Sequence, residues 1–272
     1  MPQFICPVCA KPLNEEEKSY KCENRHNFDI AKSGYINLLP PSPAGKRHGD
    51  DKLMIKARTA FLDKGYYDPL SNKIAELTAS YIPSEATIID AGCGEGKYTA
   101  DLLQKTSSHG KTAHICGIDI STAALIQASK RSKQIKYCAA SIAKMPFADG
   151  CADAVLNIFS PFFIEEYSRV IKQGGLLIRA IPLERHLWEL KELIYDKPYE
   201  NDLPSPEISG FELLDQCDIS YKFSLDCNED IMALFMMTPY YYKTGKKDQE
   251  KAQNATELTV GAAFRVLVYK KL

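Results

Sequence analysis

The stretch "ATIIDAGCGEGKYTADLLQ", residues 86–104, constrains the fold of this chain more than any other segment. A short β-branched run reaches Asp90, and a helical pattern begins near Lys97. Three glycines occupy alternate positions between them: Gly92, Gly94 and Gly96. Glycine lets the backbone approach a ligand closely, and a helix N-terminus favours anionic groups. The stretch therefore predicts a strand, a nucleotide-binding loop and a helix.

Strands and helices alternate along much of the remaining chain. Apolar periodicity predicts helices over residues 51–65, 69–81 and 163–171. Further strands are predicted over residues 114–121, 134–141, 153–159, 172–182 and 262–271. This alternation is typical of a doubly wound α/β sheet.

The spacing of the glycines bears on which nucleotide is bound. Dinucleotide folds use G-x-G-x-x-G, whereas this loop reads G-x-G-x-G and follows Asp90 by two residues. Asp119 ends the second strand, where an acidic side chain is placed to bind ribose hydroxyls. With "MPF" after the third strand and "QGG" before the fifth, residues 65–182 resemble the class I S-adenosylmethionine-dependent methyltransferases. The resemblance implies a Rossmann-like sheet; Ser141 departs from it, because such enzymes often carry an acidic residue there for adenine.

A second constrained segment, "CPVCAKPLNEEEKSYKCENRH", lies near the start of the chain. Its candidate ligands are Cys6, Cys9, Cys22 and His26. Metal binding, a disulfide and coincidence are all conceivable, but a disulfide leaves one cysteine over and needs no histidine. Three thiolates and an imidazole at this spacing favour a structural zinc ion. Because protein fills all four tetrahedral positions, this zinc is expected to hold a shape rather than to catalyse.

Bulk composition excludes several classes of protein. Hydrophobic residues make up 45% of the chain, which suits a globular core, and no apolar run approaches the roughly 18 residues of a membrane span. No signal peptide is visible, and the other five cysteines are scattered, so a cytoplasmic protein without a disulfide framework is expected. Net charge is −1, yet residues 1–60 and 241–272 both carry an excess of Lys and Arg, as nucleic-acid contacts at the two ends would require.

Several motifs together resemble the bacterial 23S ribosomal RNA (guanine-N1)-methyltransferases. They are "CPVC…CENRHNFDIAKSGYINLLP", "ARTAFLDKGYYDPL", "DAGCGEGKY", "RVIKQGGLLI", "PLERHLWELK" and "MTPYYY". The resemblance implies methyl transfer from S-adenosylmethionine to guanine N1 in a hairpin loop of 23S rRNA, a structural zinc, and a homodimer. It also implies cofactor contacts from Tyr67, Gly94, Glu95 and His186. A small-molecule methyltransferase with a zinc appendage and a non-catalytic RNA-binding protein are the alternatives.

The expected organisation is a zinc-binding RNA-recognition module at 1–35, a linker at 36–60 and a methyltransferase domain at 61–272. The segment Asn157–Pro161 is where this fold usually presents the acceptor, and Phe159 and Phe162 are candidates to stack on a base. No catalytic residue is assigned, because no motif supports His186 or Glu165 as a general base.

Overall fold

A single eight-stranded sheet forms the centre of the protein. The computed structural model describes residues 3–40 and 49–272. Its strand order is β10-β11-β9-β8-β5-β6-β7-β4, in which β4 to β9 run parallel to one another and β11 is antiparallel to both of its neighbours, β9 and β10. The bounds are β4 Tyr35–Asn37, β5 Glu85–Ala91, β6 Thr112–Asp119, β7 Lys136–Ala139, β8 Ala152–Ile158, β9 Ile171–Pro182, β10 Phe211–Leu225 and β11 Leu258–Lys271. The predicted α/β class is confirmed.

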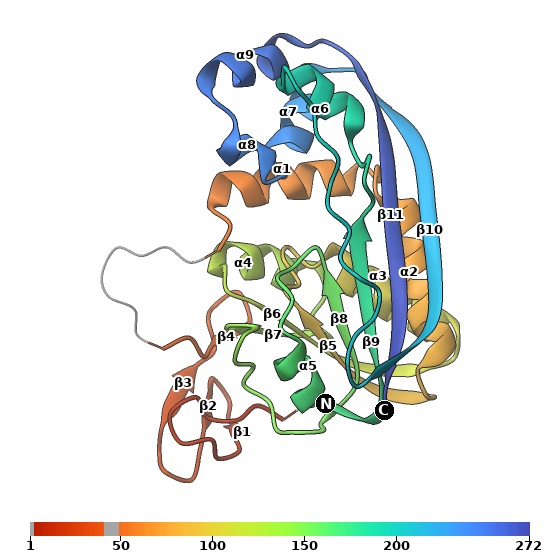
Figure 1. The fold of residues 1–272 in the computed structure, drawn as a ribbon. Helices are drawn as coiled ribbons and strands as arrows, with labels where there is room; N and C mark the ends of the chain where they lie inside the picture. Colours follow the sequence, from red (N-terminus) through yellow and green to blue (C-terminus); the bar gives the residue numbers. More distant parts are fainter. Residues whose placement is uncertain (1–2, 41–48) are drawn as a thin grey trace.

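Helices cover the sheet on both faces and above its carboxyl ends. Their bounds are α1 Lys52–Asp63, α2 Asp68–Tyr81, α3 Lys97–Ser108, α4 Thr122–Arg131, α5 Ile164–Val170, α6 Trp188–Ile194, α7 Asn228–Met236, α8 Tyr240–Lys243 and α9 Lys246–Asn254. Successive residues of β5 point to opposite faces of the sheet. Ile88 is buried in a hydrophobic cluster with residues of α2 and α3, and Ile89 is buried in a second cluster on the other face. Figure 1 shows α1 and α6–α9 grouped above the sheet, beside the long β10–β11 ribbon.

A local cap explains where α1 begins. The Asp51 carboxylate accepts hydrogen bonds from the backbone N–H groups of Leu53 and Met54 at 2.8 and 2.9 Å. An N-cap of this kind satisfies donors that the first helical turn leaves free. The helix that begins at this cap lies above the carboxyl end of the sheet (Figure 1).

The N-terminal segment packs directly against the sheet. Its small strands are β1 Asn14–Glu15, β2 Ser19–Lys21 and β3 Asn27–Asp29. Phe4 stacks on Phe147 with ring centroids 5.4 Å apart, and the Lys136 amine donates to the Tyr20 hydroxyl at 3.0 Å. Phe4 and Tyr20 are buried in the same cluster as Ile89. The segment is therefore fixed to the loop that follows β7, at the lower left of Figure 1.

The segment predicted as a linker, 36–60, contains regular structure at both ends. It starts inside β4, whose Ile36 pairs with Cys138 of β7, and it ends inside α1. The middle of the predicted linker, 41–48, lies outside the described residues. The boundaries 1–35, 36–60 and 61–272 stay a prediction.

The stretch 183–260, to which the sequence analysis assigned no structure, supplies the edge strand β10 and helices α6 to α9. No helix in the described part of the chain is both long and apolar enough to cross a membrane.

Candidate functional site

The glycine loop joins β5 to α3 at the carboxyl edge of the sheet. Gly92, Gly94 and Gly96 all have positive φ angles of 89°, 55° and 85°. A side chain at Gly92 would lie 2.5 Å from Ser160 Cβ, and one at Gly96 would lie 2.8 Å from Ala128 Cβ. At Gly94 the nearest atom is Arg58 Nη1, at 3.6 Å. Packing therefore requires glycine at the two outer positions, whereas Gly94 faces a space bounded only by a flexible side-chain end.

Asp90 lies buried beneath this loop. Its Oδ2 accepts a hydrogen bond from the Thr99 hydroxyl at 2.6 Å, while its Oδ1 is buried without a partner. Burial raises the pKa of Asp90 to about 7, the Thr99 hydroxyl lowers it, and nearby Asp119 raises it further. An unpartnered buried carboxylate oxygen next to the loop suits a cationic ligand.

Asp119, at the end of β6, holds the glycine loop through hydrogen bonds to the backbone. Its two oxygens accept the backbone N–H groups of Gly94, at 2.9 Å, and Ser121, at 2.8 Å. Burial raises the pKa of Asp119, and these two N–H groups oppose that rise. Each carboxylate oxygen can accept more than one hydrogen bond, so contact with ribose hydroxyls stays available.

Glu95 has a structural role that the sequence did not suggest. Its side chain is 2% exposed and pairs with the Arg131 guanidinium, which also binds Asp63 at 2.8 Å. Its Oε1 accepts the backbone N–H of Lys97 at 3.2 Å, at the start of α3. The carboxylate is thus occupied within the protein, and any contact from Glu95 to a cofactor is expected from its backbone.

Tyr67 and His186 meet in the folded protein, although 119 residues separate them in the chain. The Ala263 N–H donates to His186 Nδ1 at 3.2 Å, so the neutral ring carries its proton on Nε2, 3.3 Å from the Tyr67 hydroxyl. Burial lowers the pKa of His186 to about 3, and Lys191 adds to that effect. Both residues pack on Phe264. This imidazole is neutral and hydrogen-bonded at both nitrogens, which argues against the general-base role.

The segment after β8 presents an exposed aromatic ring, that of Phe159. Phe159 has a φ of 53° and is 45% exposed, a left-handed conformation that a bulky residue adopts only when its surroundings impose it. The buried amide of Asn157 holds the following turn by donating to the Ser160 carbonyl at 3.1 Å and the Pro161 carbonyl at 3.2 Å. Phe162 instead packs under the Arg179 guanidinium, 4.1 Å from its ring centroid.

The predicted zinc ligands converge. One ligand atom from each of Cys6, Cys9, Cys22 and His26 lies within 4.8 Å of all the others. Cys9 Sγ and Cys22 Sγ are 3.6 Å apart, and His26 Nδ1 is 3.5 Å from Cys6 Sγ. Ligand atoms on one tetrahedral zinc lie about 3.5–3.8 Å apart, so the set fits the ion. The backbone N–H of Lys11 is the main cause that lowers the pKa of Cys9 to about 6, whereas burial raises that of Cys6.

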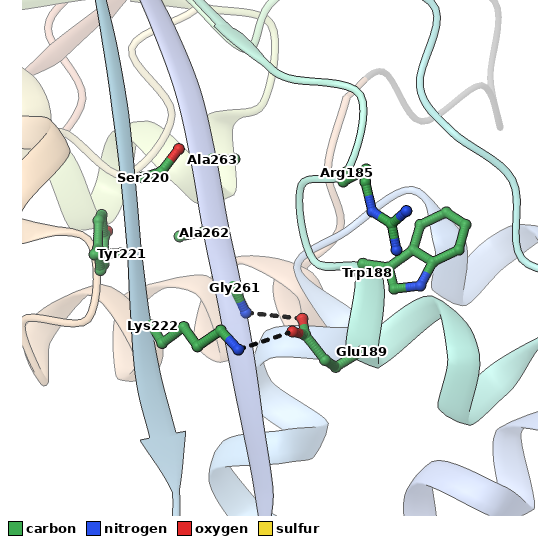
Figure 2. A pocket seen from close by; sticks show the side chains of 9 residues that line it. All are labelled: Arg185, Trp188, Glu189, Ser220, Tyr221, Lys222, Gly261, Ala262 and Ala263. Atoms are coloured by element: carbon green, nitrogen blue, oxygen red, sulfur yellow. Dashed lines mark hydrogen bonds and ion pairs between the residues drawn. The ribbon is translucent and has the colours of Figure 1, made fainter.

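A separate hollow of about 330 Å³ lies on the β10–β11 ribbon, beside the loop that carries His186. Figure 2 shows Arg185 and Trp188 on one side of it and Lys222 on the other. The Arg185 guanidinium lies 4.2 Å from the Trp188 ring centroid, and Glu189 accepts the Gly261 N–H at 2.8 Å. This hollow contains none of the predicted cofactor residues, and the sequence analysis did not find it.

The charged groups around the glycine loop suit S-adenosylmethionine. That cofactor carries a sulfonium, an ammonium and a carboxylate; the loop follows the buried Asp90, its Gly94 N–H donates to Asp119, and Arg58 lies above Gly94. The individual assignments of Tyr67, Asp90, Gly92, Gly94, Glu95, Gly96, Asp119 and His186 to cofactor binding stay predictions.

Comparison with known proteins matches both parts of the chain. The zinc-ribbon family described as "RlmA, N-terminal" matches residues 4–43, and a methyltransferase-domain family matches residues 82–253. A Bacillus halodurans C-125 structure provisionally described as a methyltransferase superposes with a TM-score of 0.50, at 14% identity over 74% of this chain and 98% of that one. This last likeness concerns the fold alone.

Two curated relatives carry the comparison further. A Bacillus subtilis (strain 168) protein, provisionally named a 23S rRNA (guanine-N1)-methyltransferase, is 36% identical over 72% of this chain and 70% of its own. The 23S rRNA (guanine(748)-N1)-methyltransferase of Streptomyces fradiae is 32% identical over 70% of this chain and 66% of its own. The chain therefore belongs to the zinc-ribbon family of 23S rRNA (guanine-N1)-methyltransferases, which use S-adenosylmethionine.

Proposed function

We propose that this protein transfers a methyl group from S-adenosylmethionine to N1 of a guanine in a hairpin loop of 23S rRNA. The observation that carries the proposal is a Cys3His zinc ribbon packed against a G-x-G-x-G methyltransferase sheet in one hydrophobic cluster. The names of the curated relatives supply the target base.

When bound, the cofactor supplies a methyl group already activated by its sulfonium. The chain's own task is then to hold the acceptor nitrogen in line with that methyl and to exclude water. Gly94 and Asp119 form the floor of the proposed cofactor site, and the N–H of Gly94 donates to the Asp119 carboxylate, which holds the loop in place. The neutral, buried His186 and Tyr67 form its back wall.

Phe159 is the proposed platform for the acceptor guanine. Its ring is half exposed, and it contacts Tyr98 and Phe264 with centroids 6.3 and 5.5 Å away. A base that is splayed out of an RNA loop stacks on such a ring. Guanine N1 carries a proton at neutral pH that must leave during transfer. We assign no residue to that step.

The RNA contacts are proposed at two places. The zinc ribbon is one, and the stacked pair Arg185 and Trp188 with nearby Lys222 is the other, because an indole, a guanidinium and an ammonium together suit a base and its phosphates. A homodimer, proposed from the family resemblance, would cover Leu213 and Leu214, which are exposed on the edge strand β10. We place the protein in the cytoplasm, with its ribosomal substrate.

The test is transfer of a radiolabelled methyl group to a 23S rRNA hairpin transcript, followed by mapping of the modified nucleotide. The matched control transcript carries adenine in place of the mapped guanine. The proposal expects label in the first transcript and none in the second, with transfer that falls as salt rises. Label that appears only in small metabolites would support the small-molecule alternative. Cofactor binding without any transfer to RNA would support the non-catalytic alternative.

A further inference from the structure

Arg58 lies directly above the glycine loop, although no glycine-loop pattern includes it. Its Nη1 is the nearest atom to the position that a side chain at Gly94 would occupy, 3.6 Å away. Its Nη2 donates to the Met237 carbonyl at 3.3 Å, which holds the guanidinium over the loop from the other side. The side chain is 26% exposed. A cation thus faces the one glycine of the loop that packing leaves open.

The ionic partner of Arg58 is a carboxylate on an irregular segment. Asp50 Oδ2 lies 2.6 Å from Arg58 Nη1. The Asp50 carbonyl accepts the Ser121 hydroxyl at 2.7 Å, and Gly49 is so close to Ile120 that a side chain on it would lie 2.7 Å from that residue. The segment therefore lies over the residues that directly follow Asp119, at the edge of the proposed cofactor site.

The other cations near the loop are occupied within the protein. Lys97 binds Asp68 of α2 at 3.0 Å and Asp101 of its own helix, α3, at 2.6 Å. Arg131 binds the buried Glu95 and Asp63. Among these three cations on the described part of the chain, Arg58 has the partner that is easiest to exchange, because Asp50 belongs to no helix or strand, whereas the exposed partners of the other two lie in helices.

We propose that Arg58 binds the carboxylate of the methionine moiety of S-adenosylmethionine, and that the Asp50 carboxylate occupies that place in the cofactor-free protein. This inference deepens the proposed function and rests on its cofactor. The methionine carboxylate enters a site with two acidic side chains, Asp90 and Asp119, and needs a cation to offset their repulsion. A guanidinium binds carboxylates with two parallel hydrogen bonds, so one carboxylate can replace another there.

The experiment compares two ligands by isothermal titration calorimetry on the full chain: S-adenosylmethionine and its decarboxylated form. Arg58→Gln should weaken binding of S-adenosylmethionine about 10- to 100-fold and leave binding of the decarboxylated form nearly unchanged. Lys56→Gln, an exposed charge change on the same helix, is the matched control and should change neither. Equal losses for both ligands, or no loss for either, would overturn the role of Arg58.

Asp50→Asn tests the exchange separately. Removing the competing charge should tighten binding of S-adenosylmethionine about two- to fivefold without changing that of the decarboxylated form. Weaker binding of S-adenosylmethionine to Asp50→Asn would mean that Asp50 helps to hold the cofactor site. It would overturn the proposal that the cofactor carboxylate replaces Asp50 on Arg58. Arg58→Lys retains the charge and should recover part of the discrimination, even if Arg58→Gln folds poorly. Methylation of the rRNA hairpin by the unmodified protein is measured independently. A failure of the proposed function can therefore be told apart from a failure of the proposed role of Arg58.

Discussion

Replacing Asp90 by asparagine should stabilise the cofactor-free protein at neutral and alkaline pH. The carboxyl group of Asp90 has an ordinary pKa of 3.8 in the unfolded chain, and burial raises it to about 7 in the folded protein. Asparagine has the same shape as the protonated acid, and its carbonyl oxygen can still accept the Thr99 hydroxyl that now binds Oδ2 at 2.6 Å.

The sign follows from proton linkage. Between the two pKa values the folded protein retains a proton that the unfolded chain has lost, so the free energy of unfolding falls as pH rises through this window. A difference of about three pH units corresponds to about 4 kcal/mol, reached in full above the folded pKa. For a chain of this size, a loss of about 4 kcal/mol in unfolding free energy lowers the melting temperature by roughly 10 °C relative to a protein without the buried carboxylate.

The assay is urea unfolding of the original protein and of Asp90→Asn at several pH values from 4 to 8.5. The difference in unfolding free energy should be near zero at pH 4 and should grow in favour of the variant until about pH 7. Asp202→Asn, an exposed change, is the control and should follow the original protein throughout. Parallel profiles for Asp90→Asn and the original protein, or a variant that is less stable at pH 8, would refute the reasoning.

Four further changes test the site and the zinc ribbon. Asp119→Ala should weaken binding of S-adenosylmethionine by about 1–3 kcal/mol in calorimetry, because it removes the proposed acceptor for the ribose hydroxyls and the acceptor that holds the Gly94 N–H; unchanged affinity would contradict this. Cys22→Ser should reduce the zinc content from one ion per chain, measured by mass spectrometry of the metal, while an unchanged zinc content would argue against the Cys3His set. Phe159→Ala should lower methyl transfer to the hairpin without affecting cofactor affinity, since its ring is the proposed stacking platform. Trp188→Ala should weaken hairpin binding in a filter assay at constant salt, and unchanged binding would exclude the hollow as an RNA contact.

Local signals in the sequence were sufficient for the parts of the site that lie close together in the chain. The zinc ligands span 21 residues, and their Cys-x-x-Cys spacing already indicates a shared ion. The strand–glycine–helix order likewise predicted the loop, because three alternating glycines accept backbone angles that other residues avoid. The edge strand β10 was not predicted, although its sequence alternates as a half-buried strand does. Its partly buried residues Cys217, Ile219, Tyr221 and Phe223 alternate with exposed ones.

Partners that are distant in the chain could not be predicted in this way. The family resemblance implies that Glu95 contacts the cofactor, but it could not show that the Glu95 carboxylate binds Arg131, 36 residues later. Arg58 lies in the quoted stretch "ARTAFLDKGYYDPL", but no role could be assigned to it from the sequence, because its position above Gly94 depends on how α1 packs over the sheet.

Local patterns were enough to predict the α/β class, the glycine loop and the four candidate zinc ligands, since backbone preference and ligand spacing act over a few residues. Tertiary structure decided what the side chains around the loop do. It placed the buried Asp90 beside Asp119, turned Glu95 inward and fixed the zinc ribbon to the loop after β7 through Phe4. The physical reason is that burial and charge pairing depend on which segments meet in space, and the parallel sheet brings together strand ends that lie tens of residues apart.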